Sequence, residues 1–158
     1  MPTLIPTITL LLALVAPTQA ADEAPSPNQI LAGKAAASSS GSGNFYDGNG
    51  SIAGRISSNG RSISEYNSQG SYAGRIDRSK NSANIYDGKG SYAGRASTSG
   101  SGTSFYDSRG SYSGRSTTSG NTTQFHDGRG AYSGRAVTSC GTTSFYDSSG
   151  RYVGRKGR

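Results

Sequence analysis

The feature that most constrains this chain is a motif that returns every 20 residues from Asn44 onward, without insertion or deletion. The clearest copy reads SFYDSRGSYSGR over residues 104–115. A fixed period of this length indicates a repeat architecture, in which each copy is one supersecondary unit stabilised by its neighbours. The six copies begin at Asn44, Ser64, Asn84, Ser104, Gln124 and Ser144.

Three columns of the repeat never vary. Each copy samples the same structural position, so a residue kept in all six meets a demand of the shared unit rather than of a single site. The fold is therefore better specified than the function. The invariant columns are Gly50, Gly70, Gly90, Gly110, Gly130 and Gly150; Gly54, Gly74, Gly94, Gly114, Gly134 and Gly154; and Arg55, Arg75, Arg95, Arg115, Arg135 and Arg155.

The D-x-x-G element, in which Asn67 replaces Asp in the second copy, predicts that each copy is a β-hairpin. Asp caps a type I turn, and Gly takes the left-handed position that closes a three-residue loop between antiparallel strands. A second turn, such as the one at residues 99–102, separates successive hairpins. We therefore predict an all-β fold of six 20-residue hairpin repeats in an antiparallel meander. An elongated or solenoid-like sheet, a closed barrel and a propeller all remain open.

The hairpin register also predicts how side chains share the two faces of the sheet. Tyr106 should face Tyr112, and Phe105 should face Ser113, because positions equally distant from the loop pair. Strict alternation then gathers all ten tyrosines on one face with the second glycine column. The opposite face should carry the Phe or Ile column, small Ala and Ser residues, the turn Asp and the invariant Arg.

Two segments precede the repeats. Residues 1–20 contain no charged side chain, and an apolar run over residues 10–16 is followed by small residues at Thr18 and Ala20. This pattern predicts a secretory signal peptide over residues 1–20, since the apolar run is too short to cross a bilayer. Residues 21–43, rich in Pro, Ala, Ser and Gly, predict a flexible linker. We therefore place the repeat domain at residues 44–158 and expect a secreted or periplasmic protein without an integral membrane span.

The repeats contain no Pro, Leu or Trp and few large aliphatic residues, a composition that approaches disordered sequences. The regular placement of the aromatic residues favours a folded array. The chain carries a formal net charge of +7, which is typical of proteins that meet anionic polymers.

The run GNTTQFHDGRG over residues 120–130 resembles the YD repeats of Rhs-type bacterial proteins. The resemblance covers residues 44–158 in the form of short motifs. It implies spiralling β-hairpins on an exported protein, and the chain is also similar to small exported tandem-repeat proteins of Gram-negative bacteria. It implies no specific activity, cofactor or site residue.

Catalytic and metal-binding patterns are thin, so we predict a non-enzymatic protein without a cofactor. His126 is the only histidine, and Asp127 beside it on a strand points to the opposite face. One Asp in each repeat, engaged in its own turn, supplies too few oxygens for calcium. Cys140 stands in a turn column that holds Gly60, Gly100 and Gly120, which indicates a drifted turn residue; an intermolecular bridge is the alternative.

The arginine and tyrosine columns are the candidate site. The arginines form either a structural ladder, meeting a turn Asp or strand carbonyls, or a row that binds polyanions. The tyrosines are either buried between layers or form a stacking platform for sugars or bases. Candidate polyanion-binding residues are Arg55, Arg75, Arg95, Arg115, Arg135 and Arg155, and candidate stacking residues are Tyr72, Tyr92, Tyr112, Tyr132 and Tyr152.

We therefore expect a structural or binding module of the bacterial envelope or the extracellular space. The alternative is a polyanion-binding protein with nucleic acid, acidic polysaccharide or lipopolysaccharide as ligand. The Thr-rich turns also leave an ice-binding or adhesin role open, and self-association is a further possibility.

Overall fold

The structure is a computed structural model that describes residues 42–157, which form twelve β-strands. The predicted signal peptide and the predicted linker up to residue 41 lie outside the described residues. Strand β1 begins at Gly43, the last residue assigned to the linker. The strands are β1 Gly43–Asp47, β2 Ile52–Asn59, β3 Ser62–Asn67, β4 Tyr72–Arg78, β5 Ser82–Asp87, β6 Tyr92–Ser99, β7 Gly102–Asp107, β8 Tyr112–Ser119, β9 Thr122–Asp127, β10 Tyr132–Ser139, β11 Thr142–Tyr146 and β12 Tyr152–Gly157.

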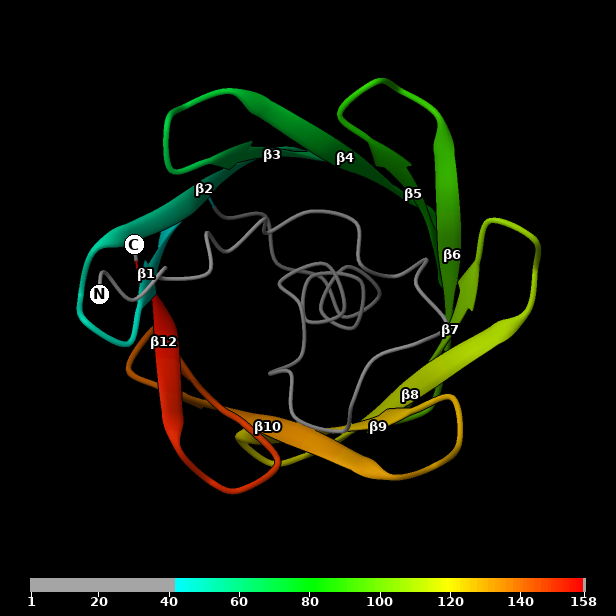
Figure 1. Ribbon diagram of the computed structural model, residues 1–158. Coiled ribbons are helices and arrows are strands. Elements are labelled where there is room, and N and C mark those ends of the chain that lie inside the picture. The colour runs from blue at the N-terminus through cyan, green and yellow to red at the C-terminus, as the bar shows by residue number, and fades with distance from the viewer. Residues whose placement is uncertain (1–41, 158) are drawn as a thin grey trace, which may run out of the picture.

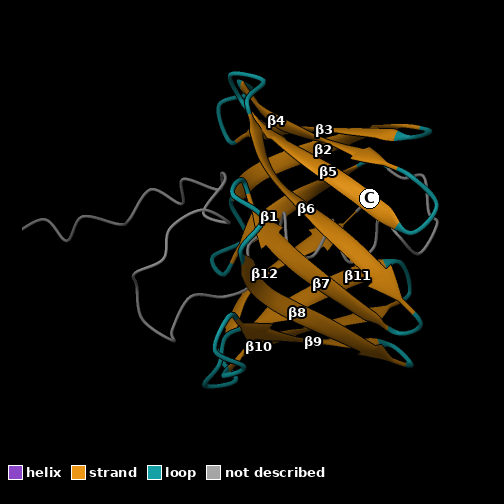
Figure 2. Ribbon diagram, turned by 90° about the vertical axis from the view of Figure 1, so that its right-hand side faces the viewer, coloured by secondary structure: helices purple, strands orange, loops and turns teal. Residues whose placement is uncertain are grey.

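The predicted antiparallel meander is confirmed, and it closes into a barrel (Figure 1). Each strand pairs with its neighbours in the chain, and β1 pairs with β12. The closing pair places Tyr46 opposite Arg155, as Tyr106 lies opposite Arg95 between two internal repeats. The join therefore has the register of an ordinary repeat boundary. The D-x-x-G loops lie at one end of the barrel and the intervening turns at the other (Figure 2).

The D-x-x-G turns have the geometry that the sequence predicts. In the fourth copy, the N–H of Gly110 donates to the carbonyl of Asp107 over 3.0 Å, and Gly110 has φ +82°. The Asp107 carboxylate accepts the N–H groups of Arg109 and Ser111 at 2.9 and 2.8 Å. The first glycine column therefore supplies a left-handed backbone position that other residues adopt at a cost.

A β-bulge in every hairpin overturns the predicted division of the faces. Tyr106 faces Tyr112 as expected, but Phe105 faces Gly114 instead of Ser113, because Ser113 is an extra residue in the ladder. A bulge interrupts strict alternation, so every residue beyond it changes face. The second glycine column consequently lies buried with the Phe and Ile residues. The arginine that follows it lies on the outer face with the tyrosines, so its assignment to the opposite face was wrong.

The second glycine column is required by a close approach between neighbouring repeats. A Cβ atom on Gly74 would lie 2.6 Å from the carbonyl oxygen of Tyr86, and Gly74 has φ +155°. Gly94, Gly114 and Gly154 have similar φ angles, and each approaches the carbonyl of the equivalent residue in the adjacent repeat. An alanine here would meet rigid backbone in addition to adopting a strained conformation.

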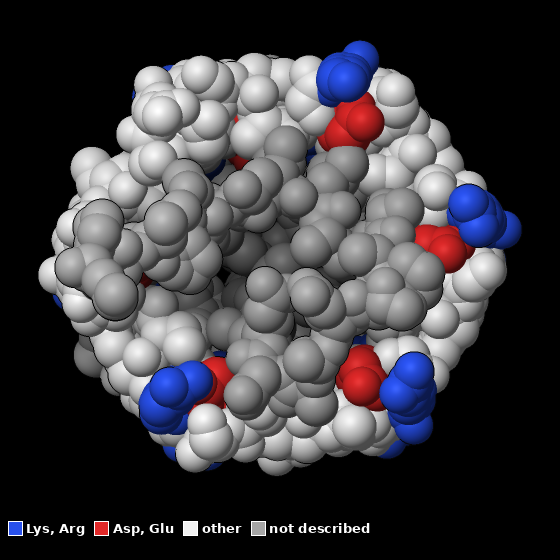
Figure 3. Space-filling view, in the orientation of Figure 1, with Lys and Arg blue, Asp and Glu red and all other residues white. Residues whose placement is uncertain are grey.

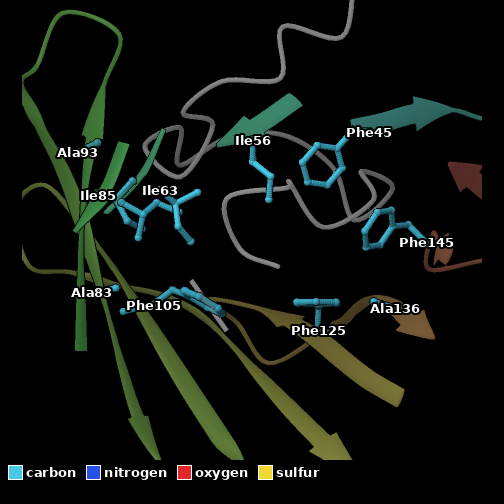
Figure 4. Packing of buried hydrophobic residues seen from close by; sticks show 12 residues of the cluster. Phe45, Ile56, Ile63, Ala83, Ile85, Ala93, Phe105, Phe125, Ala136 and Phe145 are labelled. Carbon is cyan, nitrogen blue, oxygen red and sulfur yellow. The ribbon is translucent and has the colours of Figure 1, made fainter. Parts of the chain in front are cut away.

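Each repeat contributes a few buried apolar side chains to the barrel interior (Figure 4). The Phe45 and Phe145 rings lie 6.3 Å apart on either side of β12, so they pack across the strand that closes the ring. Most of the other buried positions hold Ile, Ala, Ser or Thr. The largest buried apolar side chains are Phe45, Phe105, Phe125, Phe145, Ile56, Ile63, Ile76 and Ile85.

The two glycine columns predict different mutational costs. Gly74→Ala should destabilise the protein by about 3 kcal/mol, because the new Cβ meets the Tyr86 carbonyl. Gly70→Ala is the matched control, since Gly70 has φ +80° with open space around it and should cost only about 1 kcal/mol. Urea unfolding of both variants measures the difference, and equal costs would contradict the close approach.

Cys140 occupies a glycine position of the second turn, as the sequence predicts. It is exposed and has φ +48°, close to +57° at Gly100 and +54° at Gly120. Cys140→Gly should therefore raise the free energy of unfolding by about 1 kcal/mol. Thermal unfolding under reducing conditions checks this, and Cys140→Ala, which keeps a Cβ at positive φ, should gain nothing comparable. A destabilised glycine variant would assign the thiol a structural role.

Candidate functional site: an outer belt of arginine and tyrosine

The two tyrosine columns and the invariant arginines lie on the outer face and form a belt around the barrel. We call this set the Arg–Tyr belt. Its members are Arg55, Arg75, Arg95, Arg115, Arg135 and Arg155, with Tyr46, Tyr66, Tyr72, Tyr86, Tyr92, Tyr106, Tyr112, Tyr132, Tyr146 and Tyr152; Ile52 and His126 complete the two aromatic columns.

Within each hairpin, the belt is held by paired rings. Tyr106 and Tyr112 lie edge to face, with centroids 6.1 Å apart and planes at 76°. Four other hairpins repeat this contact at 6.0 or 6.1 Å, including His126 with Tyr132. Aromatic pairs prefer this geometry, so five of the six hairpins carry their own stabilising ring contact next to the bulge, and the first places Ile52 opposite Tyr46 instead.

Between hairpins, the belt is held by arginine. The guanidinium carbon of Arg95 lies 4.6 Å from the ring centroid of Tyr106, which belongs to the next repeat. The same contact recurs at Arg55, Arg75 and Arg135, and Arg155 places its guanidinium 5.0 Å from the ring of Tyr46 across the barrel closure. Cation–π contacts therefore link consecutive repeats and the two ends of the array.

The structural ladder expected from the sequence is present, but its expected partners were wrong. The arginines stack on tyrosine rings, while the turn Asp carboxylates accept N–H groups of their own loops. Among the column arginines, all of which are described, only Arg75 forms a salt bridge, to Asp77 at 3.1 Å. Sequence reasoning missed the ring partner because it placed arginine and tyrosine on opposite faces.

Arg115 departs from the pattern. Its register partner in the next repeat is His126. The other five copies have tyrosine at this position. No stacking contact occurs between Arg115 and this ring, although the side chain has the same strand position as Arg95. Arg115 and Arg95 thus form a natural pair of positions, one without the ring contact and one with it.

Solvent exposure separates the two tyrosine columns. Tyr72, Tyr92, Tyr112 and Tyr152 are 42–45% exposed, and Tyr132 is half-buried. The first-column tyrosines, such as Tyr106, are half-buried between the arginine and the second ring. Of the candidate stacking residues, four are therefore accessible to a ligand. The sequence could not rank them, because the ranking depends on which ring the arginine covers.

Basic side chains also lie at the rim formed by the D-x-x-G loops, close to acidic ones. The D-x-x-G loops carry Lys89, Arg109 and Arg129, and Arg151 follows the last loop, but each lies beside the Asp of its own turn. Figure 3 shows this end of the barrel, where basic side chains at the rim lie next to acidic ones. Arg151 and Asp147 form a salt bridge of 2.8 Å. Among the belt arginines, only Arg75 has a comparable acidic partner within residues 42–157.

The belt has no acid–base partner for His126. The Asp127 carboxylate accepts the N–H groups of Arg129 and Ala131 at 2.9 and 2.8 Å, while His126 packs its ring against Tyr132. Within residues 42–157, no group of three or more His, Cys, Asp or Glu side chains is suited to hold a metal ion. In the same range, no helix is long and apolar enough to cross a membrane.

Glu65 is a buried titratable residue that the sequence analysis did not single out. It stands in the column that otherwise holds Phe45, Ile85, Phe105 and their equivalents, and it is 6% exposed. Burial raises its pKa from 4.5 to about 8. The sequence does show a carboxylate at a position where the other five copies have Phe or Ile. Its burial could not be inferred without knowing that this position faces the barrel interior.

Comparison with known proteins identifies no relative: no family model matches the chain, and no similar sequence was found among curated proteins. The candidate site therefore rests on the geometry of the belt.

The buried Glu65 predicts a pH-dependent stability. Between pH 4.5 and about 8 the unfolded chain ionises Glu65 while the folded protein keeps it protonated, so stability falls as pH rises through this window. Glu65→Gln should remove this decline. Urea unfolding midpoints of the parent and the variant at several pH values isolate the contribution of Glu65. A parent curve parallel to that of the variant would contradict the raised pKa.

Proposed function

We propose that this chain is an exported, non-enzymatic β-repeat protein that acts as a structural and binding module at the bacterial envelope or in the extracellular space. The leader-like residues 1–20 support export, and the resemblance to YD repeats supports an extracellular structural role. The closed array of near-identical repeats supports a scaffold that presents one surface many times.

The observation that carries the proposal is the position of the Arg–Tyr belt on the outside of the barrel. Half of its aromatic rings hold the repeats together, as Tyr106 does between Arg95 and Tyr112. Four tyrosines of the second column, Tyr72, Tyr92, Tyr112 and Tyr152, leave more than two fifths of their surface exposed. Exposed aromatic residues beside arginine are typical of binding surfaces. The belt therefore joins a structural role to a recognition role.

A polyanion is the ligand class that the arginines favour. Stacking on tyrosine occupies the flat face of the guanidinium, while its N–H groups point outward in the plane of the group. Those donors match carboxylate, sulfate and phosphate oxygens. Acidic polysaccharide, nucleic acid and lipopolysaccharide all carry such groups, and the exposed Arg95, Arg115 and Arg155 are available to meet them.

Arg95→Gln and Arg115→Gln separate the structural and binding contributions. Arg95→Gln should lower stability by about 0.5–1 kcal/mol, because it removes a cation–π contact, whereas Arg115→Gln should leave stability unchanged. Both variants should weaken retention on immobilised heparin by a similar amount. The loss should shrink as salt rises, since each engaged charge contributes about one logarithmic unit of affinity per tenfold change in salt.

Thermal unfolding and heparin elution measure the two effects on the same samples. Arg109→Gln is the matched control, because Arg109 is a basic loop residue at the rim beside Asp107. Retention that is unaffected by both belt variants but is lost in Arg109→Gln would assign binding to the rim and overturn the proposal.

A further inference from the structure

The composition of the belt points to a narrower ligand class. On the outer face, each column arginine has an uncharged polar residue directly opposite it on the partner strand of its own hairpin. Arg95 faces Asn84, Arg115 faces Ser104, and Arg155 faces Ser144. Directly opposed residues have Cβ atoms about 5 Å apart, so one small ligand can reach both side chains.

An exposed tyrosine completes the same surface. Tyr92 precedes Arg95 on β6, and the bulge between them brings both side chains to the outer face. Tyr92 and Arg95 are both exposed, and Arg95 rests on Tyr106 of the next repeat. Each such unit therefore offers an exposed guanidinium that forms no salt bridge within residues 42–157, a neutral hydrogen-bonding group and an open aromatic ring.

Three repeats hold this unit in full. They are Asn84 with Tyr92 and Arg95, Ser104 with Tyr112 and Arg115, and Ser144 with Tyr152 and Arg155.

The other three repeats each lack one element of the unit. Arg75 is engaged by Asp77 at 3.1 Å, Arg55 has Ile52 in place of the exposed tyrosine, and Tyr132 beside Arg135 is half-buried.

The curvature of the barrel excludes a stiff, extended ligand. Six copies complete one turn, so equivalent units point in directions about 60° apart on a convex surface. A nucleic acid duplex, with a persistence length of about 50 nm, cannot follow that curve and would meet one or two units. A ligand short enough to occupy one unit meets no such restriction.

We propose that these three units are separate subsites for an acidic sugar, with the carboxylate on arginine, the sugar ring on the exposed tyrosine and a hydroxyl on Asn84 or its equivalent serine. Sugars present hydroxyl donors together with a carboxylate acceptor, and so use both the arginine and the neutral side chain. A phosphodiester backbone offers only acceptors and leaves the oxygen of the neutral side chain without a donor. This inference rests on the belt being the binding surface, as proposed above.

The test is calorimetric titration of the repeat-bearing mature chain with trigalacturonate. We expect about three equivalents to bind, and fully methyl-esterified trigalacturonate, which has lost its charge, to fail to bind. Tyr92→Ser should lower the number of equivalents by one and leave the dissociation constant of the remaining subsites unchanged. Asp77→Asn should release Arg75 beside the exposed Tyr72 and add one equivalent.

Two further results would overturn the proposal: equal binding of the methyl ester, or a tetrathymidylate oligonucleotide that binds with the same stoichiometry and the same dependence on Tyr92. Unchanged stoichiometry in both Tyr92→Ser and Asp77→Asn would also overturn it. Heparin retention that still depends on Arg95 and Arg115, without trigalacturonate binding, would reject the sugar subsites alone. Retention independent of both arginines would reject the belt as a binding surface.

Discussion

The structure depends on the bulge that follows each D-x-x-G turn. The extra residue, Ser113 in the fourth copy, turns Gly114 inward and Arg115 outward. Only glycine fits the inward position, since the carbonyl of His126 in the next repeat approaches its Cα. The invariant pair of glycine and arginine is therefore one device: the glycine lets two repeats come together, and the arginine then reaches across their boundary.

Ring closure uses the same device. Gly154 lies against the carbonyl of Tyr46, and Arg155 stacks on the Tyr46 ring, so β12 meets β1 as any repeat meets the next. An open array of these repeats would leave two unpaired strand edges, which a closed barrel removes. The Phe45 and Phe145 rings add an apolar contact across the closing strand.

Three substitutions in single repeats show what each of these positions requires of its side chain or backbone. Cys140 adopts the backbone of a turn glycine at the cost of strain, so that column requires a conformation rather than a missing side chain. His126 keeps the edge-to-face pair with Tyr132 while Arg115 makes no stacking contact with it. Glu65 replaces an apolar side chain in the interior and is held protonated at neutral pH by burial. The arginine is present in all six copies, including those that carry these substitutions.

The Arg–Tyr belt divides its side chains between internal contacts and solvent. The ring of Tyr106 packs against both the Arg95 guanidinium and the Tyr112 ring, which restricts the Arg95 side chain. Arg95 and Tyr92 nevertheless remain exposed on the outer face. A side chain that is already ordered loses less conformational entropy on binding, so a structural contact and a binding role are compatible in the same residue.

The sequence by itself determined the period, the hairpins, the turn geometry at Asp107 and Gly110, and the pairing of Tyr106 with Tyr112. These features depend on contacts within one hairpin, where residue type and spacing are sufficient. Only the tertiary structure decided that the meander closes, that the second glycine column is buried and that arginine shares a face with tyrosine. The bulge reverses the alternation that a single strand would follow, and the inward glycine is required because the backbone of the neighbouring repeat lies against it.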